Sequence, residues 1–196
     1  MKNLDQDKSR EYIKETFDES QYIMAVERCK LHLNLFPDDD YIWLEYGRAL
    51  LILYRYEDAI DAIEKSIQIL DDSDVCLAYG IMGDLYQKRG MYEEASFWYE
   101  KAAESSPEDA TFWIELGVNH MRHGNFEQAI LNLTRGSRCK IGCIDEAYYN
   151  LSMVKVCQGL YQEALTYLEK SLEISPDYDI AKRKMNEIQR CIELHQ

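Results

Sequence analysis

The stretch YEEASFWYEKAA at residues 92–103 decides the fold, because its pattern recurs through the chain. YEDAIDAIEKSI begins at Tyr56, FEQAILNLTRGS at Phe126 and YQEALTYLEKSL at Tyr161, and a fainter copy, YIMAVERCKLHL, begins at Tyr22. In each copy an aromatic residue stands three positions before an alanine, and these alanines are Ala25, Ala59, Ala95, Ala129 and Ala164. They are 34, 36, 34 and 35 residues apart, so the chain is predicted to be an array of repeated units.

A second pattern with helical spacing lies upstream of each of the four strong copies. Its residues are spaced by three, one and three positions, which places them on one stripe of a helix. The stripes are Trp43, Tyr46, Gly47 and Leu50; Tyr79, Met82, Gly83 and Tyr86; Trp113, Leu116, Gly117 and His120; and Tyr148, Leu151, Ser152 and Lys155. Gly90, Gly124 and Gly159 follow three of them and are suited to end a helix in a left-handed conformation. Each unit is therefore predicted to be a helix, a tight turn and a second helix.

Together the two patterns resemble the tetratricopeptide repeat, W-x2-L-G-x2-Y followed by A-x3-F and a proline. Trp113, Leu116 and Gly117 match its first part, and Ala164, Leu168 and Pro176 match its second. The resemblance covers residues 6 to 176 and implies an all-α fold, a right-handed α-solenoid of antiparallel helix pairs. It implies one domain over residues 1–196, with about five units, the first of them degenerate, at 6–39, 40–75, 76–109, 110–144 and 145–176.

Two features lie outside the regular pattern. After Pro176 a last helix is expected at residues 178–194, with Ile180, Met185, Ile188 and Ile192 on one face. This pattern is typical of a capping helix that seals the last repeat, and an amphipathic helix for a membrane or a partner is the alternative. Insertions near residues 72–74 and near Gly142 lengthen two of the connections.

In proteins of this resemblance the first helix of each pair lines a concave surface. The residues predicted to form a peptide-binding groove there are Tyr41, Leu44, Arg48, Leu51, Leu77, Asp84, Lys88, Thr111, Ile114, Val118, Met121, Arg122, Tyr149 and Met153. Their apolar members predict an exposed patch for an extended or helical peptide with apolar anchors. The alternatives are that terminal or inserted segments cover the groove, or that a tight stack buries these residues.

Composition and cysteine spacing narrow the partners and the compartment. The chain has 36 acidic and 22 basic residues, a net charge of −14, which disfavours nucleic acid and anionic lipid and favours a basic partner or simple solubility. A secretory signal is not expected, because residues 1–20 are charged throughout and contain no apolar core. A membrane-inserting segment is not expected either, because the longest apolar run, Ala49 to Tyr54, is far short of the roughly 20 residues that span a bilayer. Six cysteines without a C-x-x-C pair favour free thiols in a reducing cytoplasm.

Motifs for catalysis or for cofactor binding are not found. The sequence lacks a phosphate loop, H-E-x-x-H, a nucleophile elbow and a dinucleotide fingerprint, and no ligand cluster completes a metal site around His120 and His123. We therefore expect no enzyme activity, no metal and no cofactor. The expected function is a cytoplasmic scaffold or adaptor that binds a peptide segment of a partner protein. The alternatives are a dedicated chaperone for a secreted or assembly client, or an acidic inhibitor or immunity-type protein for a basic enzyme; the oligomeric state stays open.

Overall fold

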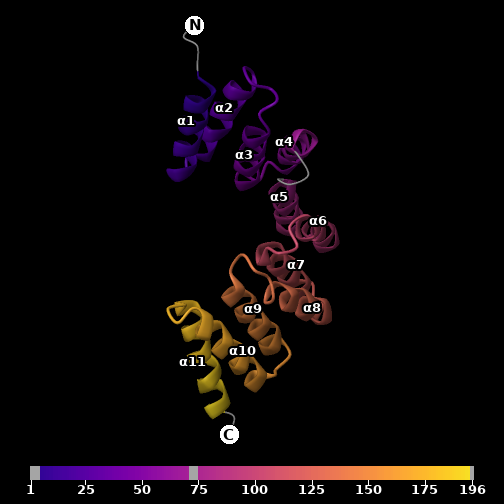
Figure 1. Ribbon diagram of the computed structural model, residues 1–196, viewed down its shortest axis with the longest axis vertical. Coiled ribbons are helices and arrows are strands. Elements are labelled where there is room, and N and C mark those ends of the chain that lie inside the picture. Colours follow the sequence, from indigo (N-terminus) through magenta and orange to yellow (C-terminus); the bar gives the residue numbers. More distant parts are fainter. Residues whose placement is uncertain (1–4, 71–74, 195–196) are drawn as a thin grey trace. The chain divides into compact units, whose positions relative to one another are not determined.

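The computed structural model describes residues 5–70 and 75–194, and in these residues the chain is all-α without a β-strand (Figure 1). The insertion predicted near residues 72–74 lies outside the described residues. The fold is confirmed as a series of helix pairs followed by one further helix. In chain order the helices are α1 (Gln6–Asp18), α2 (Tyr22–Leu33), α3 (Asp40–Ile52), α4 (Tyr56–Ile69), α5 (Val75–Lys88), α6 (Tyr92–Ser105), α7 (Ala110–Arg122), α8 (Phe126–Gly136), α9 (Ile144–Cys157), α10 (Tyr161–Ile174) and α11 (Asp179–Leu194).

The chain divides into two compact units, and each is described by itself. Unit 1 ends at Arg89 and holds α1 to α5, and unit 2 begins at Gly90 and holds α6 to α11. The boundary falls between the two helices of the third predicted repeat, residues 76–109. A single continuous domain over residues 1–196 therefore stays a prediction.

The core of unit 1 forms where α2 packs on α3 and α3 packs on α4. Ile13, Cys29, Leu33 and Ile42 are buried together, with Phe17, Trp43 and Tyr46 packed against them. The glycine of the repeat pattern has a direct role in the α3–α4 approach. A Cβ atom added at Gly47 would lie 2.5 Å from Cγ1 of Ile63, so only a residue without a side chain allows these helices to lie so close.

Unit 2 repeats this packing around α7, α8 and α9. Its buried cluster contains Ala110, Ile114, Ala129, Leu133, Ala147, Leu151 and Val154, and three of these seven (Ala129, Leu133 and Leu151) belong to the two sequence patterns. At its C-terminal end α11 packs on α10, where Ala181 and Ile188 are buried with Ala164 and Leu168. The prediction of a capping helix is thereby confirmed: Met185 and Ile192 also pack against this cluster, while Ile180 of the predicted apolar face is 47% exposed.

The turn between the two helices of a repeat has the same backbone conformation in unit 1 and in unit 2. Gly124 and Gly159, five positions before their repeat alanines, have φ angles of +83° and +74°. The corresponding residues of the first two repeats are Ser20 and Tyr54, with φ angles of +57° and +60°. The turn thus keeps its left-handed geometry where glycine is absent, at a cost of about 1–2 kcal/mol for such a residue.

Candidate functional site

The predicted groove residues of unit 1 do not all lie on its surface. Tyr41, Arg48, Leu77 and Lys88 are exposed and Asp84 is half-buried on α3 and α5. Arg48 donates a hydrogen bond of 2.7 Å from its guanidinium to Oε1 of Glu45. Burial raises the pKa of the Glu45 carboxyl, and Arg48 acts in the opposite direction. The positive charge of Arg48 is therefore held in place within unit 1 and is not freely mobile.

The expected exposed patch is wrong for three of its apolar members. Leu44, Leu51 and Ile114 are only 8%, 5% and 3% exposed, so they are core residues. The physical reason is the number of neighbours: α3 contacts α2, α4 and α5, and α7 contacts α6, α8 and α9. A helix packed on three sides buries a wider arc of its surface than the one packing stripe that the prediction of the groove assumed to be buried. These three side chains are not available to a peptide.

The remaining groove residues of unit 2 form a surface on two neighbouring helices. Thr111 and Arg122 of α7 are exposed, and Val118, Met121 and Met153 are half-buried. Val118 and Met121 pack partly against the core of unit 2, while α7 and α9 contact each other directly. We call these five residues the α7–α9 face. Two of its five side chains are the thioethers of Met121 and Met153, and the cation of Arg122 stands at the C-terminal end of α7.

Tyr149, the other predicted groove residue of unit 2, is half-buried against the C-terminal part of the chain. Its ring lies 5.6 Å, centroid to centroid, from the ring of Tyr178, and it packs against the cluster that holds α11. Burial raises the pKa of Tyr178 to about 12, and the nearby carboxylate of Glu146 and the Tyr149 phenol act in the same direction. The capping segment therefore covers part of Tyr149, as one of the alternatives for the groove anticipated.

Sequence reasoning missed a buried polar network in unit 1. His32 Nε2 lies 2.7 Å from Oδ2 of Asp39, and His32 Nδ1 lies 2.8 Å from Oγ of Ser9. The order is that of a Ser–His–Asp relay, but Arg10 also binds the carboxylate at 2.8 and 2.9 Å. Ser9 is buried within α1 and its amide donates to the Asp5 carbonyl, so that group cannot stabilise an oxyanion. The network acts as a structural link between helices.

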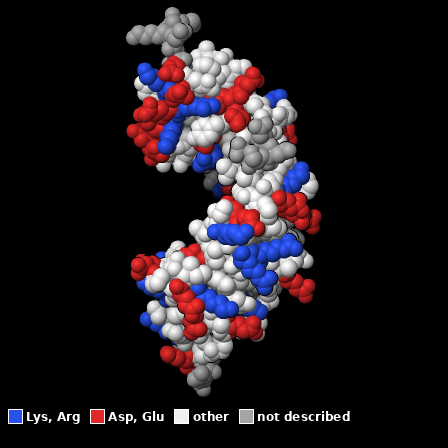
Figure 2. All heavy atoms as spheres, viewed as in Figure 1, with Lys and Arg blue, Asp and Glu red and all other residues white. Residues whose placement is uncertain are grey.

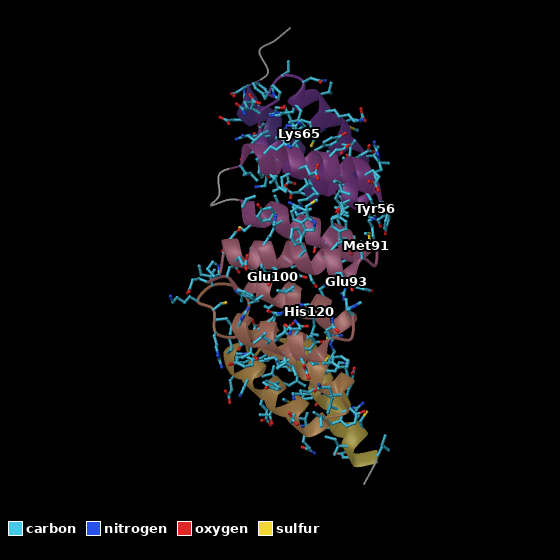
Figure 3. All side chains as sticks on the ribbon, turned by 90° about the vertical axis from the view of Figure 1, so that its right-hand side faces the viewer. Tyr56, Lys65, Met91, Glu93, Glu100 and His120 are labelled. Atoms are coloured by element: carbon cyan, nitrogen blue, oxygen red, sulfur yellow. The ribbon has the colours of Figure 1, made fainter. Side chains whose placement is uncertain are left out.

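Pockets of measurable volume lie away from the predicted groove. One of about 460 Å³ in unit 1 has Trp43 and Tyr46 beside the acids Asp58, Asp61 and Glu64, with Lys65 labelled in Figure 3 at its edge. A second, of about 470 Å³ in unit 2, is mainly apolar and lies between the α9–α10 turn and the end of α11. Its lining includes Leu160, Tyr161 and Ile192. Both pockets are lined partly by residues of the repeat patterns, but each joins separate helices, so the patterns alone did not predict them.

Charge and ligand chemistry place further limits on the site. Both acidic and basic side chains appear over each unit in Figure 2, so the visible face carries no continuous field of one sign. Among residues 5–70 and 75–194 there is no group of three His, Cys, Asp or Glu side chains placed to hold a metal ion. Burial lowers the pKa of His120, which Figure 3 shows on α7. In the same part of the chain, no helix combines the length and the apolar character needed to cross a bilayer.

Comparison with known proteins adds to this geometry. Residues 88–171 match the family model of the anaphase-promoting complex (cyclosome) subunit 3. The chain is 25% identical over 161 residues to the BBSome complex member BBS4 homolog of Drosophila melanogaster. This match covers 81% of this chain and 32% of that protein. It is 26% identical over 169 residues to the TPR repeat-containing protein MJ1428 of Methanocaldococcus jannaschii, covering 84% of this chain and 29% of that protein. The chain thus spans about a third of the length of these relatives.

A solved structure gives the same architecture over nearly the whole chain. YrrB, described as a TPR protein with an unusual peptide-binding site, superposes with a TM-score of 0.64 at 17% sequence identity. The match covers 93% of this chain and 92% of YrrB. At this identity the likeness establishes the fold alone.

Proposed function

Because the chain is a tetratricopeptide repeat protein, we propose that it is an interaction scaffold that binds an extended peptide segment of a partner protein. The α7–α9 face is the surface that we assign to this peptide. Stacked helix pairs of this kind present long surfaces to their ligands rather than deep cavities. YrrB, with the same fold, is described as having a peptide-binding site, and a comparable role is proposed here on this chain's own residues.

The observation that carries the proposal is the chemistry of the α7–α9 face. Met121 and Met153 are half-buried on neighbouring helices, and unbranched thioether side chains adapt to varied apolar anchors. Arg122, which follows Met121 in α7, is exposed and carries a fixed positive charge. A peptide with apolar anchors and a nearby carboxylate fits this arrangement.

Catalysis is not part of this proposal. The relay-like group of Ser9, His32 and Asp39 is buried and committed to holding helices together. The free cysteines, three of which are exposed, fit a reducing compartment such as the cytoplasm. Nucleic acid is an unsuitable ligand for a chain with a net charge of −14.

A selection from a library of short random peptides tests the proposal. Selected peptides are measured by fluorescence polarisation against the wild type, Met121→Glu and Met153→Glu, at low salt and at about 1 M salt, where screening shortens to ~3 Å. Leu131→Glu is the matched control, since it introduces the same charge at an exposed position of α8, which is in unit 2 but outside the α7–α9 face. Far-ultraviolet circular dichroism verifies that each variant is folded.

Binding that survives high salt, is lost in both methionine variants and persists in Leu131→Glu supports the α7–α9 face. Equal binding by all four proteins that disappears at high salt sinks it. That result moves the function to the acidic surface and favours the inhibitor of a basic enzyme. The chaperone alternative is tested by competition: the segment of a single client should displace every selected peptide from the α7–α9 face.

A further inference from the structure

Four exposed apolar side chains lie on α2 and in the turn that follows it. Ile23, Met24, Leu31 and Leu35 are 48% to 72% exposed, and Tyr12 of α1 is exposed beside them. Glu27 and Arg28 lie in the middle of this set along the helix. We call Ile23, Met24, Glu27, Arg28, Leu31 and Leu35 the α2 outer face.

The other repeats of the chain serve as internal controls for this face. Ile23, Met24 and Leu31 stand two and one positions before, and six positions after, the repeat alanine Ala25. Every later repeat has charged or amide residues at these three positions: Glu57, Asp58 and Lys65; Glu93, Glu94 and Lys101; Glu127, Gln128 and Arg135; and Gln162, Glu163 and Lys170. A terminal repeat normally has a polar outer face, which keeps the array soluble. The first repeat reverses this rule.

The polar groups in the middle of the face make only a few contacts within the chain, and Arg28 donates one hydrogen bond from Nη1 to the backbone oxygen of Tyr12. Arg28 lies over the Tyr12 ring, 5.9 Å from its centroid, and among the described residues no carboxylate is within ion-pair distance of it. Glu27 pairs with Lys30 at 2.8 Å, but both side chains are well exposed, and such a pair is worth little. A pocket of about 270 Å³ opens between Ser9, Tyr12, Arg28 and Leu31.

We infer that two copies of this chain pair through the α2 outer face, with their α2 helices antiparallel across a two-fold axis. A two-fold interface must be self-complementary, so a residue that contacts another is contacted by its equivalent in return. Met24 and Leu31 are equally far along the helix from the midpoint between Glu27 and Arg28. An axis at this midpoint brings Met24 against Leu31 of the second copy, and Glu27 against Arg28 of the second copy, twice over.

The pattern favours a second copy over an unrelated helix, because the sequence of α2 alone supplies both the apolar contacts and the opposite charges of such an interface. The apolar residues flank the axis on both sides. At the centre, Glu27 faces Arg28 of the second copy, and Arg28 faces Glu27 of the second copy, so each charge meets its opposite. One helix face is smaller than a standard interface of roughly 1,200–2,000 Å². The pairing is therefore expected to be weak and to depend on protein concentration.

Sedimentation equilibrium across protein concentrations gives the first test. The wild type should shift from monomer towards dimer as concentration rises. The triple variant Ile23→Glu, Met24→Asp, Leu31→Lys takes the residues that α4 has at these positions, so it should fold and stay monomeric. Leu131→Glu should dimerise like the wild type. A wild type that stays monomeric throughout, or a triple variant that dimerises equally, overturns the pairing.

Charge exchange tests the register itself. Glu27→Arg and Arg28→Glu each place four like charges around the axis, so each should raise the dissociation constant at least about tenfold. Mixing the two single variants restores opposite charges at both contacts, and their heterodimer should form with nearly the wild-type affinity. If the mixture associates no better than either variant alone, the two-fold arrangement is wrong. Circular dichroism checks that each variant is folded.

Discussion

His32 Nε2 lies 2.7 Å from Oδ2 of Asp39, and both side chains are completely buried. The same carboxylate accepts two hydrogen bonds from Arg10 of α1 and caps α3 by accepting from the Ile42 amide at 3.2 Å. One carboxylate therefore joins three helices of the first two repeats. The degenerate first repeat lacks the aromatic–glycine stripe, and this buried network supplies part of the attachment that the stripe supplies elsewhere.

The stability of unit 1 should fall in acid because of Asp39. Burial raises the pKa of its carboxyl, but the hydrogen bonds from Arg10 and its other donors outweigh this effect and lower the pKa to about 2. A depressed pKa stabilises the fold above the unfolded value of about 3.9, and this stability is lost as pH falls towards 2. The difference amounts to about 2 kcal/mol. Urea unfolding of the wild type and of Asp39→Asn between neutral pH and pH 2 measures it as the difference between their two pH dependences.

Replacement of Asp39 should separate its network from its role as a helix cap. Asp39→Ala leaves Arg10 and His32 without their acceptor and should cost about 3 kcal/mol. Asp109 caps α7 in the same way, accepting from the Thr111 amide at 2.9 Å. Asp109→Ala should therefore cost only about 1 kcal/mol. Equal losses of stability in the two variants would show that the network adds nothing beyond the cap.

The fold could be predicted from the sequence because its determinants are local and repeated. The alanines and glycines recur in register, and the capping helix expected at 178–194 is found at Asp179–Leu194. The turns at Ser20 and Tyr54 could not be recognised, since only glycine signals a left-handed residue from sequence alone. In the structure both residues adopt this conformation between two helices of one repeat.

The candidate site was harder to predict because burial depends on all the neighbours of a helix. Helical spacing placed Ile114 and Val118 on one face, but only the packing of three helices around α7 separates the buried residue from the half-buried one. The Asp39 network joins Arg10 to a residue 29 positions away, and no local pattern carries that information. Sequence periodicity gives the face of a helix, and the width of its buried arc requires the structure.

Truncation of Ile114 tests the corrected assignment of this residue to the core. Ile114→Ala removes a side chain that is 3% exposed and should lower the free energy of unfolding by about 2–5 kcal/mol. Val118→Ala, one turn along α7 and half-buried, should cost clearly less. Urea unfolding followed by circular dichroism compares the two. A loss for Ile114→Ala no larger than that for Val118→Ala would return Ile114 to the surface.

Cys29 should be inert towards thiol reagents in the folded protein. Burial raises its thiol pKa to about 12, and the carboxylates of Glu45 and Asp39 act in the same direction. Since the thiolate is the reactive species, exposed cysteines such as Cys143 and Cys191 should react far faster. Timed alkylation with mass spectrometry should show Cys29 modified only after unfolding in urea. Native modification at the rate of Cys191 would mean that α2 opens from α3.

Gly117→Ala should destabilise unit 2 although alanine favours a helix by about 1 kcal/mol over glycine. The new Cβ would lie 2.6 Å from Cγ of Leu133 and 3.2 Å from its backbone nitrogen. Overpacking of this kind costs about 1–3 kcal/mol, and the backbone of α8 cannot move aside as a flexible side chain could. The steric effect should therefore exceed the gain in helix propensity.

Gly136→Ala is the graded control, because its Cβ would approach Cγ1 of Ile114 only to 3.3 Å and should leave stability nearly unchanged. A double-mutant cycle with Leu133→Ala then isolates the clash. Leu133→Ala alone opens a cavity, and the alanine at position 117 partly fills it, so the double variant should be more stable than the two single losses predict by at least about 0.5 kcal/mol. Strictly additive losses would locate the cost of Gly117→Ala outside the contact with Leu133, and the close approach of α7 and α8 would then not be the reason for glycine at this position.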